Sequence, residues 1–351
     1  MKIIHYSNNP ISSHGGIEHV VRYASALSRL NNIKSINKCI NVGDNRINRR
    51  VDRVYQTSFK IKGNWVSLQY IFDAFKTNKR DTIVVHYPNF NAVLSGLIAS
   101  HFARRTIVLC HSSCNHYGGL TSAVYKVLLK LYNRKSEFWT TSNTLAKTLR
   151  RLDGISVKKI QKITPFQKCA SRKATARLDA TWLGDIGAFD ILVIGRLSSY
   201  KGRLNLNDVT NARVVICETN KPKRNVKKLN SNIVVLEGPL SETEKQYIIQ
   251  KARLLCFYAL NEGEGFGLLQ LEASRLGIPV VNSYVRTGVI EAGLNEVNAI
   301  TLSQKDFCLR SIQEILQDKE RLKRISDNAN SYYETYYNRN LIIKQLAENF
   351  E

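Results

Sequence analysis

Three glycines stand close to Glu264 and Glu272 in the second half of the sequence. They belong to Glu262-Gly-Glu-Gly-Phe-Gly-Leu-Leu-Gln-Leu-Glu272, which joins a strand-like apolar run to a helix-like one. The glycines permit a tight turn, and a helix starting near Gly267 would offer free N–H groups to a phosphate. Glu264 on the turn and Glu272 in the helix could both reach hydroxyl groups of that ligand. A glycine-rich turn before a core helix, with two solvated glutamates, would give the same pattern.

A pair of cations follows another apolar run in the same half of the chain. FDILVIG reads as a buried strand and leads directly into Gly195-Arg-Leu-Ser-Ser-Tyr-Lys-Gly202. Ligands of α/β sheets bind at the carboxyl ends of parallel strands. At such a place the planar fork of Arg196 and the point charge of Lys201 would suit a diphosphate. Taken alone, the loop could equally be a pair of surface cations.

A third loop lies between the first strand-like run and the first helix-like run. It reads Ser13-His-Gly-Gly-Ile-Glu18. Gly15 and Gly16 would expose backbone donors at a helix N-terminus, where anions bind. The loop is not GxGxxG, and no acidic residue ends a following strand, which argues against a nicotinamide dinucleotide site. A simple turn is the alternative.

Two histidines end strand-like runs in the first half. His86 lies in IVVHYPN and His111 in TIVLCHSS. The segment from Cys110 to His116 lacks the CxxC spacing and a distant second ligand pair, so no metal site is predicted. From the residues alone, His111 is either a satisfied histidine at a strand end or part of a ligand site. We interpret His86 as a packing residue that could border an acceptor site.

Alternating strands and helices must hold these loops in place. MKIIHYS, DTIVVHY, RTIVLCH and SEFWTTS read as strands, with helices over 17–30, 91–103 and 121–132. The pattern restarts with FDILVIG, ARVVICE, NIVVLEG, RLLCFYA and IPVVNS, and residues 304–350 read as helical. Such alternation implies parallel sheets covered by helices. We therefore predict an α/β fold with two doubly wound, Rossmann-like domains facing a central cleft.

The boundaries of these domains follow from composition. We place the first domain at residues 1–165 and the second at 188–330, joined by a basic linker at 166–187. A C-terminal helix at 331–351 could cross back to the first domain.

In this order the loops resemble those of the retaining GT-B glycosyltransferases of family 4. The resemblance covers nearly the whole chain and rests on GGIE, GRLSSYKG, LEGPLSETE, and EGFGLLQLEA followed by GIPVVNS. Glu264 and Glu272 occupy the two glutamate positions of that family's Glu-x7-Glu signature. Only RLNLNDVTN stands where the family usually has a long helix, and ICETNKP where it often has glycines. The back of the donor domain is therefore expected to be trimmed.

The resemblance implies transfer of a sugar from a nucleotide-diphosphate sugar, such as a UDP- or GDP-sugar, with retention at the anomeric carbon. Arg196 and Lys201 would hold the donor diphosphate, Glu272 the ribose, and Glu264 and His111 the donor sugar. Of these, Glu264, His111, Arg196 and Lys201 would be catalytic. Further residues would line the donor site, mainly through backbone contacts: Gly15, Gly16, Gly238, Pro239, Leu240, Gly265, Phe266, Gly267 and Leu268. The sequence has no Asp-x-Asp motif, so no metal and no cofactor is expected.

Composition limits the class of protein. The chain has 351 residues, of which 43% are hydrophobic and 23% charged, which fits two globular domains and neither a disordered nor a membrane-embedded chain. No run approaches the ~18 apolar residues of a spanning helix, and the N-terminus lacks a signal-peptide core. We therefore expect a cytoplasmic protein. Its seven scattered cysteines suggest reduced, buried thiols.

Charge is distributed unevenly along the chain. Of the net +24, residues 1–180 carry 30 basic and 8 acidic side chains, whereas residues 181–351 carry 22 and 20. The basic half should meet something polyanionic: nucleic acid, an anionic membrane surface or a phosphate-bearing substrate. No nucleic-acid recognition motif is present, and we expect no nucleic acid as partner. The charge could also be a solvated basic surface.

Charge and resemblance together favour a peripheral enzyme at the inner face of the cell membrane. It would act on a glycan or lipid-diphosphate-linked acceptor in bacterial surface-polysaccharide assembly, such as O-antigen or lipopolysaccharide. A soluble acceptor, as in sugar-phosphate synthases, is the alternative. The apolar run NAVLSGLIASHFARR could turn its terminal cations toward lipid headgroups. Candidate contacts are Arg46, Arg49, Arg50, Arg53, Lys60, Lys62, Arg104, Arg105, Lys126 and Lys130.

Overall fold

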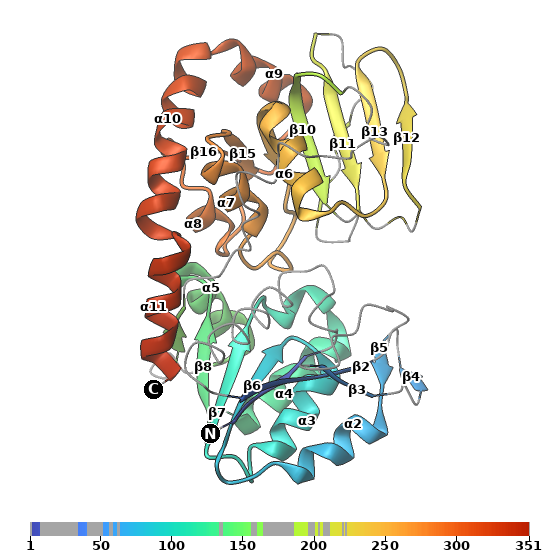
Figure 1. Ribbon diagram of the computed structural model, residues 1–351, viewed down its shortest axis with the longest axis vertical. Helices are drawn as coiled ribbons and strands as arrows, with labels where there is room; N and C mark the ends of the chain where they lie inside the picture. Colours follow the sequence, from blue (N-terminus) through green and yellow to red (C-terminus); the bar gives the residue numbers. More distant parts are fainter. Residues whose placement is uncertain are drawn as a thin grey trace. The chain divides into compact units, whose positions relative to one another are not determined.

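The computed structural model describes residues 2–7, 34–40, 52–55, 59–61, 64–132, 136–155, 160–163, 186–195, 201–202, 204–205, 211–219, 221 and 223–350. The chain divides into two compact units (Figure 1). The first contains residues 1–166 together with 339–351, and the second contains residues 167–338. The C-terminal segment thus belongs to the same unit as the N-terminus.

The first unit is built on a seven-stranded parallel sheet with the strand order β3-β2-β1-β6-β7-β8-β9. Every residue of β6 is buried, as expected of a parallel strand covered on both faces. The order reverses at β1, which has β2 on one side and β6 on the other. The strands are β1 (Lys2–Tyr6), β2 (Lys34–Ile40), β3 (Asp52–Tyr55), β6 (Asp81–Tyr87), β7 (Arg105–Cys110), β8 (Glu137–Thr140) and β9 (Ile160–Lys162), beside an antiparallel pair, β4 (Phe59–Ile61) and β5 (Asn64–Val66).

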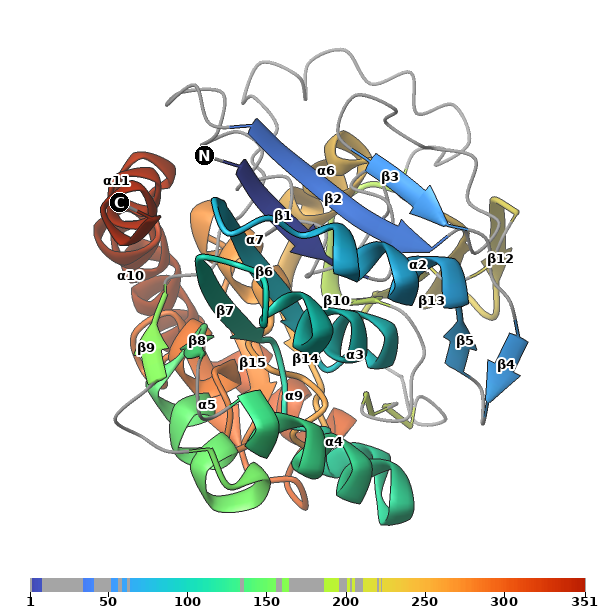
Figure 2. The same cartoon turned by 90° about the horizontal axis from the view of Figure 1, so that it is seen from below.

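Three helical segments lie in a row on one face of this sheet. They are α2 (Leu68–Phe72) with η1 (Asp73–Lys76), α3 (Phe90–Ala99) and α4 (Gly119–Tyr132). Helix α3 packs on β6 and β1 and contacts both α2 and α4 (Figure 2). Asn89 begins α3 because its side chain accepts a hydrogen bond from Ala92 N. The remaining helices of the unit are η2 (Cys114–Tyr117), α5 (Asn143–Thr148), the π-helical turn η3 (Leu149–Asp153) and α11 (Arg339–Phe350).

The structure shows how the apolar run that ends in Arg104 and Arg105 is packed. Its helix, α3, turns its apolar residues into the core of the first unit. Arg105 lies in β7 and donates two hydrogen bonds to Glu137, at 2.7 and 2.9 Å. Arg104 is exposed at the end of this run. An apolar helix next to a sheet gains more from covering that sheet than from facing solvent.

The second unit is built on another seven-stranded sheet, ordered β12-β13-β11-β10-β14-β15-β16. All neighbouring strands are parallel except β12, which is an antiparallel edge. Apolar clusters cover both faces of this sheet. The strands are β10 (Phe189–Gly195), β11 (Val214–Glu218), β12 (Asn225–Lys228), β13 (Ile233–Glu237), β14 (Ala252–Phe257), β15 (Val280–Ser283) and β16 (Ala299–Leu302).

The helices of the second unit follow its strands. Helix α6 begins with a capping box, in which Ser241 and Glu244 each bond the other's backbone N–H. Helix α10 packs against α7. The helices are α6 (Glu242–Lys251), α7 (Leu268–Arg275), α8 (Val289–Ala292), α9 (Leu309–Gln317) and α10 (Lys319–Tyr336). Within the described part of the chain, no helix is both long and apolar enough to cross a membrane.

The cysteines fit the expectation of buried thiols with one correction. Five of them are buried: Cys39, Cys110, Cys114, Cys217 and Cys256. Cys308 is instead exposed, because it lies at the N-terminus of α9 and not in a strand. Cys169 and the expected helix at 17–30 lie outside the described residues.

Candidate functional site

The strand order of the second sheet reverses at β10, which has β11 on one side and β14 on the other. The connections that leave the two strands diverge at such a point, and ligands of open α/β sheets bind there. Lys201 follows β10, and the glycine-rich loop 261–267 follows β14. Two of the loops singled out in the sequence therefore meet at one edge of one sheet.

Lys201 lies beside the carboxyl ends of β10 and β14. Its backbone forms an isolated antiparallel bridge with Ala259. Its ammonium group lies 3.6 Å from a carboxylate oxygen of Glu264 and 5.3 Å from the centre of the Phe257 ring. The side chain crosses over Gly195, where an added Cβ would come within 3.0 Å of Nζ. Glycine at the end of β10 thus leaves room for this cation.

Helix α7 begins at Gly267, whose φ of +82° is left-handed. A Cβ at this position would lie 2.9 Å from the Phe257 ring, so conformation and space both favour glycine. Glycine has no side-chain acceptor with which to cap the helix, which makes an anion a suitable partner for the first N–H groups. Thr287 fixes the preceding loop by donating to the carbonyl oxygen of Glu264 at 2.7 Å.

The apolar residues around this turn differ in burial. Phe266 is buried, and its ring lies 6.0 Å from that of Tyr337. Gly265 is buried as well, whereas Leu268 is half-buried. Phe266 thus anchors the turn, and its backbone is the part suited to contact a ligand.

Glu272 is buried in α7 and paired with a lysine that the sequence analysis did not identify. Lys245, in α6, donates to one carboxylate oxygen of Glu272 at 2.8 Å and lies 2.7 Å from the other. Glu242 lies 3.0 Å from the same ammonium group. Burial lowers the pKa of Lys245, but the two carboxylates outweigh burial and raise it. Lys245 therefore stays charged and holds Glu272 in place.

The second carboxylate oxygen of Glu272 has capacity for a further donor. This Oε2 atom is buried and forms no hydrogen bond with any described residue, since Lys245 approaches it outside hydrogen-bond geometry. Burial also raises the pKa of Glu272 above its ordinary value, despite the adjacent lysine. A hydroxyl group that donates to Oε2 would relieve part of this cost.

The segment from Gly238 to Leu240 connects β13 to α6. Gly238 donates its backbone N–H to the carbonyl oxygen of Glu218 at 3.0 Å. Leu240 is buried in the core of the second unit, and Pro239 is half-buried. Leu240 therefore acts as an anchor, and the backbone around Gly238 and Pro239 lies at the carboxyl end of β13.

In the first unit, three histidines form one hydrogen-bonded chain. Nδ1 of His5, in β1, lies 3.1 Å from Nε2 of His86, in β6. Nδ1 of His86 lies 2.9 Å from Nε2 of His111, which directly follows β7. In each pair one nitrogen donates a hydrogen bond and the other accepts it. The tautomer of one ring therefore determines the tautomers of the other two. His86 therefore does more than pack, because it connects His111 to the sheet interior.

Burial keeps this chain of histidines neutral. It lowers the pKa of His5 to about 3 and that of His111 to about 4. The pKa of His86 falls well below its usual value, because of burial and then because of its two histidine neighbours. His5 Nε2 is buried and forms no hydrogen bond within the described segments. His111 would therefore act at neutral pH as a hydrogen-bonding group without charge.

These histidines should make the protein less stable in acid. Because their folded pKa values lie below the ordinary 6.5, the unfolded chain binds more protons below that pH, and stability falls as the pH drops toward about 4. His5→Phe removes one of the groups that take up a proton on unfolding. The slope of the unfolding free energy against pH should therefore fall by up to about 1.4 kcal/mol per pH unit. Urea unfolding at several pH values measures the slope. Replacing the exposed His101 by Gln is the control, and equal slopes in all three proteins would contradict the expectation.

The loop after His111 is fixed by a buried aspartate. Ser113 donates to Asp153 Oδ1 at 3.0 Å, and the Cys114 thiol lies 3.4 Å from the same oxygen. Burial raises the pKa of Asp153. The buried Cys114 thus has a structural role in this loop.

The structure brings together only part of the predicted site. It places Lys201 next to Glu264, and Gly265–Leu268 and Glu272 on the adjoining turn and helix. Gly15, Gly16 and Arg196 lie outside the described residues. Lys245 and His5 were not predicted as site residues. The capping box at Ser241 could have shown that Lys245 lies in the first turn of a helix, but its partner Glu272 is 27 positions away in the sequence.

Part of the second unit is similar to a known protein family. Residues 187–332 match the family model described as glycosyl transferases group 1. This stretch is therefore similar to the group 1 glycosyltransferases. The matched residues include β10 to β16, Lys201, Glu264 and Glu272. No curated protein matches the chain.

Solved structures of similar architecture include named glycosyltransferases. Anabaena Alr3699/HepE in complex with UDP-glucose aligns over 100% of this chain and 99% of its own, at 15% identity and a TM-score of 0.74. Sucrose-phosphate synthase from Thermosynechococcus elongatus covers 99% and 98%, at 15% identity and 0.72. The lipopolysaccharide outer core galactosyltransferase WaaB covers 100% and 99%, at 14% identity and 0.63. The predicted fold is confirmed: the chain has the GT-B architecture with two Rossmann-like domains.

Proposed function

We propose that this protein transfers a sugar from a nucleotide-diphosphate sugar to a glycan acceptor, with retention at the anomeric carbon. The observation that carries the proposal is the meeting of Lys201, Glu264 and the N-terminus of α7 at one edge of a sheet, within the stretch similar to group 1 glycosyltransferases. A cation, a carboxylate and a row of backbone donors suit a diphosphate bonded to a sugar. The resemblance to family 4 supports the retaining outcome.

In the proposed reaction, the bond between the anomeric carbon and the diphosphate breaks and a bond to the acceptor oxygen forms. Negative charge grows on the leaving diphosphate, and the acceptor proton passes to it. Lys201, Arg196 and the first N–H groups of α7 stabilise that charge, because fixed donors aimed at developing charge lower a barrier strongly. These groups take the role that a metal ion has elsewhere, so the reaction needs no metal or cofactor.

Each remaining residue of the site has a role in holding the donor. Glu272 accepts a hydrogen bond from the ribose through its buried oxygen, and Glu264 and His111 contact the donor sugar. A neutral His111 suits hydroxyl groups, because it offers one donor and one acceptor. The backbone at 238–240 and 265–268 lines the nucleotide. HepE, whose structure contains UDP-glucose, supports a UDP-sugar as donor.

The acceptor is a lipid-diphosphate-linked glycan at the inner face of the cell membrane, in the assembly of a bacterial surface polysaccharide. The excess of basic residues in the first 180 positions supports an anionic acceptor and an anionic membrane as partners. The likeness to WaaB, a lipopolysaccharide outer core galactosyltransferase, supports the same setting.

A release assay tests the proposed activity. Purified protein is incubated with a panel of UDP- and GDP-sugars, with and without lipid-diphosphate-linked glycans, and free nucleoside diphosphate is measured. Release that depends on one donor and on acceptor supports the proposal, and proton NMR of the product reports the anomeric configuration. Inversion would overturn the retaining mechanism, and no release from any donor would overturn the activity.

A soluble acceptor is the second candidate, favoured by the similarity to sucrose-phosphate synthase. Sugar phosphates added to the same assay separate the two. Turnover with a sugar phosphate and none with lipid-linked glycans would favour this alternative.

A further inference from the structure

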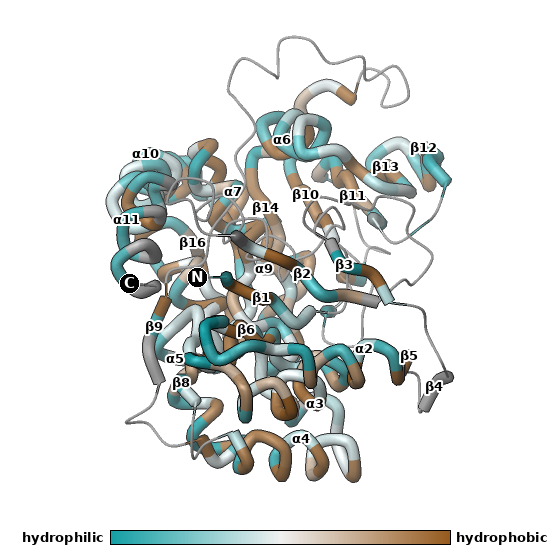
Figure 3. Tube along the Cα trace, turned by 60° about the horizontal axis from the view of Figure 1, so that its bottom comes forward, coloured by the Kyte–Doolittle hydropathy of each residue, from teal (hydrophilic) through white to brown (hydrophobic). Residues whose placement is uncertain are grey.

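Helix α4 carries apolar residues on two opposite faces. Tyr125, Leu129 and Tyr132 are buried against the first unit. On the other side, four apolar side chains recur at intervals of four, three and four residues, which aligns them in one stripe along the helix. They are Leu120, Val124, Val127 and Leu131, with 67, 39, 59 and 52% of their surface exposed. A helix that only covers a sheet would be polar on this side. Figure 3 shows several hydrophobic stretches, coloured brown, along α4.

A second group of exposed apolar residues lies in the same helical layer. Phe72 and Phe75, in α2 and η1, are 65 and 55% exposed, and Phe102, just after α3, is 37% exposed. The rings of Phe75 and Phe102 lie 6.1 Å apart. Helices α2, α3 and α4 lie side by side on one face of the sheet (Figure 2). We call the exposed side of α2, η1 and α4, with Phe102, the apolar face.

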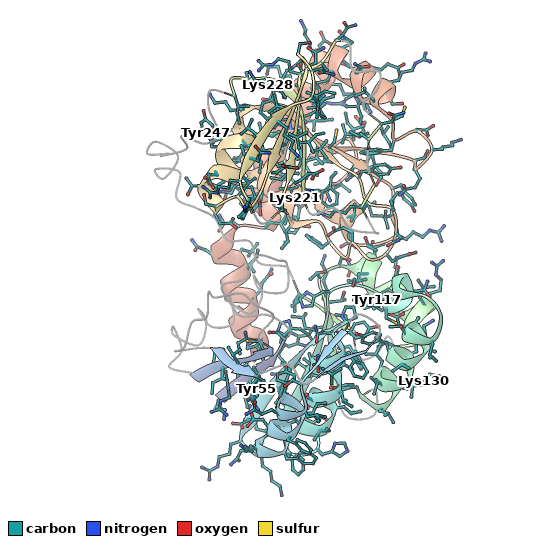
Figure 4. All side chains as sticks on the ribbon, turned by 90° about the vertical axis from the view of Figure 1, so that its right-hand side faces the viewer. Tyr55, Tyr117, Lys130, Lys221, Lys228 and Tyr247 are labelled. Atoms are coloured by element: carbon teal, nitrogen blue, oxygen red, sulfur yellow. The ribbon has the colours of Figure 1, made fainter. Side chains whose placement is uncertain are left out.

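The charges around the apolar face have one sign. Residues 64–132 contain seven Lys or Arg and only two acidic residues, Asp73 and Asp81, both of which are buried. Within this described stretch, no carboxylate is therefore exposed. Three of the cations lie in the helical segments and three in the turns that follow η1 and α3; Lys130, in α4, is labelled in Figure 4. Besides Arg105, which is bound to Glu137, they are Lys76, Lys79, Arg80, Arg104, Lys126 and Lys130.

We propose that the apolar face docks onto a bilayer that contains anionic lipids. Apolar side chains between cations match the layered chemistry of such a surface, where acyl chains lie beneath phosphate groups. A second copy of this chain would bring like charges together. Nucleic acid would pair with the cations but leave the exposed phenylalanines and leucines without apolar partners. The inference deepens the proposed function, because it identifies the surface that meets the membrane.

This orientation would bring lipid-linked substrates to the edge of the sheet that carries His111. Strand β7 ends at Cys110, and α4 begins at Gly119 after a short connection. The N-terminus of α4 therefore lies toward the carboxyl edge of the sheet, where His111 follows β7. Leu120 is the apolar residue nearest to that end. An acceptor anchored in the bilayer at this point would be held near the candidate sugar-binding histidine.

Two glutamate substitutions in the stripe test the proposal. Val127→Glu with Leu131→Glu should reduce binding to vesicles of phosphatidylglycerol and phosphatidylcholine at least tenfold, because charged groups would have to enter the apolar layer. Leu229→Glu, at a residue 61% exposed in the second unit, is the matched control and should bind like wild type. Wild type should bind much less to vesicles of phosphatidylcholine alone, and sedimentation measures all of these. Lys126→Glu with Lys130→Glu should weaken binding and flatten its salt dependence.

The outcomes separate this proposal from its rivals and from the enzymatic one. Equal vesicle binding by wild type and the Val127/Leu131 variant would overturn the apolar face as the contact. Sedimentation velocity that reveals a wild-type dimer, and a monomer for the variant, would overturn the membrane in favour of a second copy. UDP affinity measured by calorimetry should not change in the variant, so loss of folding is detected. Vesicle binding without sugar transfer would refute the activity and leave the surface intact.

Discussion

Replacing Lys201 by alanine is expected to lower the rate of sugar transfer at least tenfold. Its ammonium group would face the leaving diphosphate, and losing about 1.4 kcal/mol of transition-state stabilisation costs a factor of ten. Arg196→Ala is expected to act in the same direction. Steady-state rates of nucleoside diphosphate release, with the preferred donor at saturation, measure both variants.

Two controls make this experiment specific. Lys323→Ala removes an exposed lysine in α10 that pairs with Asp327. It lies outside the candidate site and should keep the wild-type rate. Because Lys201 lies 3.6 Å from Glu264, the double variant with Glu264→Gln tells whether the lysine acts alone. If Lys201 only orients Glu264, the double variant will be no slower than Glu264→Gln. Wild-type rates in both Lys201→Ala and Arg196→Ala would refute the role of this loop.

Substitution of Glu272 and substitution of Glu264 are expected to have different effects, the first on nucleotide affinity and the second on turnover. Glu272→Gln should weaken binding of the free nucleoside diphosphate roughly ten- to hundredfold, since a hydrogen bond to a charged group contributes about 1.5–3 kcal/mol. Glu264→Gln should mainly lower turnover and change nucleotide affinity less. Calorimetry with UDP and GDP, together with rates from the release assay, distinguishes the two effects.

Lys245 offers a further variant for the same comparison. Lys245→Met removes the cation that holds Glu272 and should weaken nucleotide binding without touching the nucleotide itself. Lys251→Met, in the last turn of the same helix, is the control, because Lys251 lies over the ring of Tyr247 and not beside Glu272. Equal losses of affinity in Glu264→Gln and Glu272→Gln would mean that the roles are divided wrongly.

The pattern of elements could be predicted from the sequence because it is local. Apolar runs such as FDILVIG and DTIVVHY favour strands that are covered on both faces, and they became β10 and β6 at the predicted places. The glycine-rich loop was also predictable, since a left-handed turn before a helix requires glycine near position 267. The partner of the apolar side of α3 was not predictable in the same way, because periodicity indicates that a helix has an apolar side and not which segment covers it.

By itself, the sequence determined the order of strands and helices, the turn at Gly267, the excess of positive charge in the first half and the resemblance that suggests a donor site. Only the tertiary structure decided which side chains meet. It joined Lys245 to Glu272 across 27 residues and His5 to His86 across 81. It also buried the apolar side of α3 while leaving one of the two apolar faces of α4 exposed. These outcomes depend on contacts between distant segments, and no local pattern of residue types records which segment will become the neighbour.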